Sequence, residues 1–181
     1  MRNNQMKQRI WASFYALSES ISFDRLTVEK IVAHCGISKA TFYRHFRDKY
    51  DLLNYNALGI TRQYFNLEHC GSWHEFFVCM FREIEKDVDY YRKAFRTSGQ
   101  NAHSRFLYEY TYGIVKDCYL KSSGRQSLTT REHYVISHYC HGCVDTLEDW
   151  LQQPDSIPGS QMAALFFDAM PNFLKRTWVM E

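Results

Sequence analysis

Apolar residues recur along the chain at the spacings of amphipathic α-helices. In the first segment they occupy positions 6, 10, 14, 17 and 21. These positions share one face of a helix that we expect to run from about Met6 to Leu17. A second helix begins after the N-cap residue Thr27, carries Ile31 and Val32 on its buried side, and ends near His34.

A glycine turn and two further caps follow. Gly36 stands where a left-handed residue is needed after the second helix, and Ser38 caps a short third helix from Lys39 to about Phe46. Asp48 caps the fourth helix and Asp51 occupies its N3 position, so both carboxylates favour the positive end of that helix. The pattern predicts two short helices joined by a tight turn.

The remainder predicts a bundle of longer helices. After a break at residues 69–72, we expect helices at about 73–96, 102–121, 129–152 and 160–178. Pro154 and the pair Pro158-Gly159 should force a turn before the last helix, and Pro171 should kink that helix or end it early. The expected fold class is all-α.

Composition and charge narrow the class of protein. The chain has 181 residues, of which 45 % are hydrophobic, so a core is expected and disorder is not. Residues 1–53 hold nine Lys or Arg against five acidic residues, a net charge of +4, whereas the remainder carries −2. The basic N-terminal part (the head) and the mildly acidic remainder (the body) are typical of a protein that contacts phosphate groups with one end only.

The chain shows no targeting signal. No apolar run approaches the ~20 residues that span a bilayer, and the first nine residues are mostly polar. We therefore expect no membrane contact and a cytoplasmic location. The six cysteines should then be reduced thiols that act as small core residues.

The segment from Thr27 to Leu53 carries the functional signal. Its short third helix buries Phe42 and Phe46, and the turn before it buries Ile37. The opposite side presents Lys39, Ala40, Tyr43 and Arg44. A helix with that outer face fits a DNA major groove, which is roughly 12 Å wide.

Over about 45 residues this segment resembles the TetR (tetracycline-repressor) family of transcriptional regulators. The residues that match the family pattern are Thr27, Ile31, Gly36, Ile37, Ser38, Tyr43, His45, Phe46, Lys49 and Leu52. The chain departs from the pattern at Val32 and Cys35, where alanines are usual, and neither lies on the DNA-facing side. The run TFYRHFRDKYDLL also resembles the branch of dihydroxyacetone-kinase regulators.

The resemblance implies a helix-turn-helix DNA-binding domain over residues 1–53 and a helical regulatory and dimerisation domain over 54–181. It implies a homodimeric repressor that binds a palindromic operator and releases it in response to an effector. In the head, Lys39 and Arg44 would read guanines, and Ala40 and Thr41 would touch thymine methyl groups. Phosphate contacts would come from Thr27, Tyr43, His45 and Lys49, with Ser38 at the helix cap.

In the body, the last two helices would form the dimer surface through Gly142, Cys143, Val144, Leu147, Leu151, Leu165 and Phe166. The alternative is that these residues pack only within the monomer. Ten of the thirteen tyrosines lie after residue 54, and tyrosine suits both a ligand pocket and a core. The candidate ligand contacts are Phe77, Phe81, Tyr108, Tyr112 and Tyr139.

Other functions have weaker support. His138, His141 and Asp145 share a helix face and Cys140 pairs with Cys143, but a helical Cys-x-x-Cys without a second pair points to packing rather than zinc. The sequence shows no nucleophile–base spacing or phosphate loop, so we expect neither an enzyme nor a cofactor. One alternative stays open, in which the body binds a partner protein instead of a small ligand.

Overall fold

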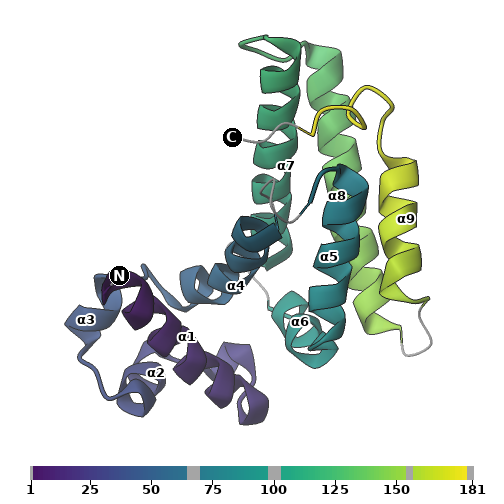
Figure 1. Ribbon diagram of the computed structural model, residues 1–181. Coiled ribbons are helices and arrows are strands. Elements are labelled where there is room, and N and C mark those ends of the chain that lie inside the picture. Colours follow the sequence, from purple (N-terminus) through teal and green to yellow (C-terminus); the bar gives the residue numbers. More distant parts are fainter. Residues whose placement is uncertain (1, 65–69, 98–102, 154–156, 179–181) are drawn as a thin grey trace.

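The computed structural model describes residues 2–64, 70–97, 103–153 and 157–178, and these residues form helices without any strand. Figure 1 shows a head of short helices joined to a taller body. The expected all-α fold is confirmed. In chain order the elements are α1 Arg2–Ser20, the 3-10 helix η1 Phe23–Arg25, α2 Val28–Cys35, α3 Lys39–Tyr43, α4 Lys49–Tyr64, α5 Trp73–Glu85, α6 Val88–Phe95, α7 His103–Ser123, α8 Thr130–Gln152 and α9 Gly159–Ala169.

One apolar cluster organises the head, which comprises α1 to α3 and the start of α4. Ile10 and Phe14 of α1 meet Ile31 of α2, Phe42 of α3 and Leu52 of α4, and all five are at most 1 % exposed. Burying a side chain of this size stabilises the fold by roughly 1.5–3 kcal/mol. The cluster therefore fixes α3 to the head through its inner side.

The body is a bundle in which α5, α7, α8 and α9 stand side by side, with α6 at their lower end next to the head (Figure 1). α5 packs along α9, and α7 packs along α8. In its core, the ring of Phe81 lies edge-on to those of Trp150 and Phe166, at centroid distances of 5.3 and 4.9 Å. Such edge-to-face pairs add to the stabilisation from burial.

The helix expected over 73–96 is wrong, because the chain forms two helices there. α5 ends at Glu85, and Asp87 begins α6 by accepting a hydrogen bond from the Tyr90 amide at 3.2 Å. Asp87 has φ −153° and ψ 59°, outside the helical region. An aspartate that caps its own downstream amides offers the backbone an alternative to a continuous helix.

Pro171 has the predicted effect on the last helix. α9 ends at Ala169, two residues before the proline, instead of continuing to Trp178. The chain beyond it folds back on α5, where Thr177 accepts a hydrogen bond from the Trp73 indole at 3.3 Å. Three residues at expected breaks or helix starts lie outside the described ranges, namely 69, 102 and 154.

α4 connects the head to the body. It packs on α1 at one end and on α5 and α7 along the rest, so the expected domain boundary at residue 53 falls inside this helix. α4 therefore belongs to both the head and the body. None of the described helices combines the length and apolar composition needed to cross a bilayer.

Candidate nucleic-acid interface and effector cavity

One cap and one glycine determine how α2 leads into α3. The Thr27 hydroxyl accepts a hydrogen bond from the Lys30 amide at 3.4 Å, as expected for an N-cap. At the other end Gly36 has φ 66°, and the Ile37 amide donates back to the Val32 carbonyl at 3.0 Å. This left-handed C-cap confirms the predicted turn and sets the direction in which α3 leaves it.

α3 buries one side and exposes the other. Ser38 caps it and accepts a hydrogen bond from the Thr41 amide at 3.1 Å. Phe42 is fully buried, whereas Tyr43 on the opposite side is 55 % exposed. The helix ends at Tyr43 rather than near Phe46, because the last turn closes with the His45 amide donating to the Phe42 carbonyl. The exposed side presents Lys39, Ala40, Tyr43 and Arg44.

Two polar contacts order this exposed face. The Lys39 ammonium forms an ion pair with Glu29 of α2, which lowers the pKa of Glu29 to about 2 and raises the pKa of Lys39. The Arg44 guanidinium donates to the Thr41 hydroxyl at 3.1 Å. Because both members of the ion pair are more than half exposed, solvent screens it, and Lys39 can exchange Glu29 for another acceptor.

Sequence reasoning missed Glu29 as a neighbour of Lys39. The predicted glycine turn could have indicated this neighbour, because it folds α3 back against α2 and brings residues ten positions apart together. Glu29 is an acidic group on the proposed DNA face. It orients Lys39 when no nucleic acid is present.

Lys49 and His45 have surroundings that the sequence did not indicate. The Lys49 ammonium donates to the backbone carbonyls of Phe23, Asp24 and Leu26, at 2.8, 3.1 and 2.9 Å. These three bonds use all its protons inside the head, and the phosphate contact expected of Lys49 stays a prediction. His45 is half-buried, and its Nδ1 is buried without a hydrogen-bond partner among the described residues.

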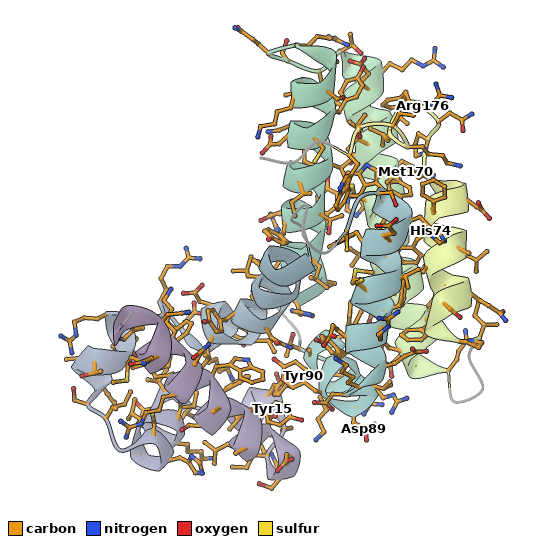
Figure 2. The ribbon with its side chains drawn as sticks, viewed as in Figure 1. Tyr15, His74, Asp89, Tyr90, Met170 and Arg176 are labelled. Carbon is orange, nitrogen blue, oxygen red and sulfur yellow. The ribbon has the colours of Figure 1, made fainter. Side chains whose placement is uncertain are left out.

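A polar and aromatic seam joins the head to the body. The Tyr15 hydroxyl of α1 donates to the Asp87 carboxylate, and this bond raises the pKa of Tyr15 to about 12. The Lys93 ammonium of α6 donates to the Ser18 carbonyl at 3.0 Å. Figure 2 shows Tyr15 and Tyr90 facing each other across the seam, with ring centroids 5.5 Å apart. α6 is thus held directly against α1.

A cavity of about 110 Å³ lies between α4, α5, α6, α7, α8 and α9. Phe77 and Tyr139, two of the five candidate ligand residues, lie on its wall. Tyr139 is buried, and its hydroxyl donates to the Phe166 carbonyl at 2.8 Å. On α6, Tyr91 and Phe95 also line the cavity. The same helix therefore contacts the cavity and the head.

The other three candidate ligand residues lie elsewhere. Phe81 packs in the core, as described above. Tyr108 stacks on His141 of α8 with ring centroids 3.6 Å apart, and the Tyr112 hydroxyl lies 2.6 Å from Nδ1 of His133. These two tyrosines hold α7 against α8. They therefore serve packing between helices rather than the cavity wall.

Most of the expected dimer residues are used within the chain. Val144, Leu147, Leu151 and Phe166 are at most 9 % exposed and belong to the core. The apolar stripe of α8 faces its own bundle, and a helix buries such a stripe against whatever packs closest. Cys143 is half-buried on the cavity wall, whereas Gly142 is exposed and Leu165 is 51 % exposed.

A different set of apolar side chains is exposed on α8, on α9 and next to α9. Its members are large, exposed hydrophobic side chains: Tyr134, Ile157, Leu165 and Phe173. Apart from Tyr43 of α3, these are the large hydrophobic residues that remain exposed among those the structure describes. Within the same described part of the chain, no three His, Cys, Asp or Glu side chains gather as metal ligands.

Comparison with known families agrees with this geometry. A family model described as "Bacterial regulatory proteins, tetR family" matches residues 17–55, and one described as "Transcriptional regulator C-terminal region" matches residues 71–172. The first match lies within the head and the second within the body. No curated protein matches the chain.

Two solved structures share the fold. "Dihydroxyacetone kinase operon activator DhaS" has a TM-score of 0.61 at 12 % identity, covering 90 % of this chain and 92 % of its own. A TetR transcriptional regulator from Streptococcus agalactiae 2603V has a TM-score of 0.60 at 15 % identity, covering 91 % of this chain and 93 % of its own. At these identities the likeness is one of fold.

Proposed function

Because this chain belongs to the TetR family of bacterial transcriptional regulators, with a DNA-binding N-terminal domain, we propose that it is a repressor that binds a palindromic operator as a homodimer. An effector in the body cavity controls its release. The observation that carries this proposal is the outer side of α3, where Lys39, Tyr43 and Arg44 are exposed while Phe42 is fully buried.

The proposed DNA contacts follow from that outer side. Lys39 and Arg44 hydrogen-bond to guanine O6 and N7, and each good bidentate contact contributes about 1–3 kcal/mol of discrimination between bases. Ala40 and Thr41 meet thymine methyl groups, and Thr27, Tyr43 and His45 contact phosphates. Lys49 also contacts a phosphate, in exchange for one of its three hydrogen bonds to carbonyls of the head.

A homodimer is proposed because one five-residue helix contacts too few bases for useful specificity. The side chains of Tyr134, Leu165 and Phe173 are apolar and exposed, on α8, on α9 and after α9 respectively. A second copy of the chain covers them. In a two-fold dimer the same patch meets itself, so one apolar surface is sufficient. The two α3 helices are then presented to successive major grooves.

Effector control is supported by the position of α6. Tyr91 and Phe95 touch the cavity, whereas Tyr90 and Lys93 touch α1. A ligand that fits only one position of α6 shifts the population of head positions accordingly. The cavity favours a small ligand over the alternative of a partner protein, because binding a protein at the surface of the body requires no cavity inside it.

Nuclease footprinting on the DNA upstream of the chain's own gene tests this function. We expect two protected half-sites whose centres are one helical turn, about 34 Å, apart. Protection should weaken steeply as salt is raised, because phosphate contacts release counterions. Uniform protection without a preferred site, at every salt concentration, would contradict the proposal.

A further inference from the structure

One buried polar pair interrupts the apolar wall of the body cavity. His103, the first residue of α7, is 2 % exposed and lines the cavity. Its Nδ1 lies 2.8 Å from the amide oxygen of Asn54 on α4, which is itself buried. Phe95 packs its ring edge-on to the imidazole at a centroid distance of 5.3 Å. The imidazole is therefore held in one orientation by groups on two other helices.

The hydrogen bond to Asn54 decides which nitrogen of His103 is protonated. An amide oxygen can only accept, so Nδ1 carries the proton and donates it. Burial lowers the pKa of His103 to about 4, and the ring is neutral at pH 7. Nε2 is thus left with a lone pair, and within the described part of the chain the bond to Asn54 is the hydrogen bond that the imidazole makes.

The rest of the wall restricts the size and charge of a ligand. Its described residues are mostly aliphatic and aromatic, with Phe77, Leu107, Ile114 and Val144 among them, and none carries a formal charge. An ionised ligand would lose its hydration without gaining a counter-charge. The volume of about 110 Å³ is close to that of apolar cavities of about 150 Å³ that bind benzene.

We propose that the ligand of this cavity is an uncharged molecule about the size of one six-membered ring, with an apolar body and one hydroxyl group that donates to Nε2 of His103. This inference rests on the proposed function, because it names the chemical class of the effector. The apolar wall contributes affinity. His103 acts as the specificity residue, because its Nε2 accepts a hydrogen bond from a ligand that carries a donor at that point.

Binding of phenol, toluene and benzoate to the purified full-length protein at pH 7 tests the inference by titration calorimetry. Phenol and toluene share size and shape but differ in the hydroxyl, and benzoate adds a charge. In His103→Phe, we expect phenol to bind roughly three- to tenfold more weakly relative to toluene than it does in the native protein, as for loss of one neutral hydrogen bond. Thr111→Val, the control, removes a hydroxyl group elsewhere on the cavity wall and should leave the phenol-to-toluene ratio unchanged. Benzoate should not bind at millimolar concentration.

A second measurement needs only the native protein, in case His103→Phe does not fold. In protein labelled with ¹⁵N-histidine, the Nε2 resonance of His103 should move on addition of phenol and stay in place on addition of toluene. An unchanged phenol-to-toluene ratio in a folded His103→Phe, a silent Nε2 resonance, or benzoate binding as tight as that of phenol would overturn the inference. Operator release by phenol is a separate readout. Its failure, with the hydrogen-bond preference intact, would count against the proposed effector control alone.

Discussion

The hydroxyl of Tyr15 on α1 is hydrogen-bonded to the carboxylate of Asp87, the residue that separates α5 from α6. One carboxylate thus has two partners, because its other oxygen accepts from the Tyr90 amide at 3.2 Å. The residue that breaks the predicted long helix is also the one that binds the head. The break between α5 and α6 therefore lies at the point where the body meets α1.

Substitutions at this contact should separate its two roles. Tyr15→Phe removes only the link to the head and should lower the free energy of unfolding by about 1 kcal/mol, the usual contribution of one hydrogen bond. Asp87→Ala removes the cap as well and should cost about 2 kcal/mol. Asp87→Asn, which still caps and still accepts, is the matched control. Chemical denaturation measures the free energy of unfolding of all three variants. Equal losses of this free energy in Asp87→Ala and Asp87→Asn would refute the capping role of Asp87.

The turn between α2 and α3 gives a second prediction. Gly36 and Gly124 both have φ 66°, and an alanine in that conformation costs about 1–2 kcal/mol. The new Cβ at residue 36 would meet its nearest neighbour, Arg9, at an ordinary 3.7 Å, so strain is the only cost. Gly36→Ala and Gly124→Ala should therefore lose similar stability by thermal unfolding. Only Gly36→Ala should also weaken operator binding, since Gly124 lies in the distant loop between α7 and α8.

The proposed dimer surface predicts a change of assembly. Leu165 is half exposed on α9, and Leu165→Glu would place a charge in the contact between copies. We expect this variant to elute as a monomer in chromatography with light scattering, whereas the native chain elutes as a dimer. Gln5→Glu on the exposed side of α1, in the head, adds the same charge on a different element and should leave the dimer intact. A dimeric Leu165→Glu would show that the copies meet elsewhere.

The buried imidazole makes stability depend on pH. His103 has its pKa lowered to about 4 in the folded chain from an ordinary value near 6.5, so the unfolded chain binds the extra proton between these values. Stability should therefore fall as pH falls through this window, by about 2 kcal/mol between pH 8 and pH 5. In His103→Gln this part of the loss should vanish. Urea unfolding at the two pH values checks the difference, and identical slopes in both proteins would contradict the burial of a neutral His103.

Local signals in the sequence were sufficient for the head. Thr27, Gly36, Ser38 and Asp48 act through neighbours within a few residues, and each occupies the cap or turn that the sequence predicts. Phe42 was also assigned correctly to the inner side of α3, because a five-residue helix has one apolar side. Elements defined by short-range hydrogen bonds are those that a single sequence determines best.

Long-range packing determines the features that the sequence alone did not predict. The ammonium of Lys49 bonds to carbonyls more than twenty residues away, and His103 meets Asn54 across 49 residues. No periodicity encodes such pairs. Leu147 and Leu151 lie on a stripe that suits an interface or a core equally well, and only the position of the neighbouring helices decides that they are core.

Selection of binding sequences from randomised DNA duplexes tests the central claim, that the outer side of α3 reads bases. The native protein should enrich a two-fold symmetric sequence whose half-sites lie one helical turn apart. Lys39→Ala combined with Arg44→Ala should enrich none while remaining dimeric. Lys175→Ala combined with Arg176→Ala should enrich the native sequence, because Arg176 lies at the far end of the body (Figure 2). If the Lys39 and Arg44 double variant selected the native sequence as strongly as the unchanged protein, α3 would not be the reading element.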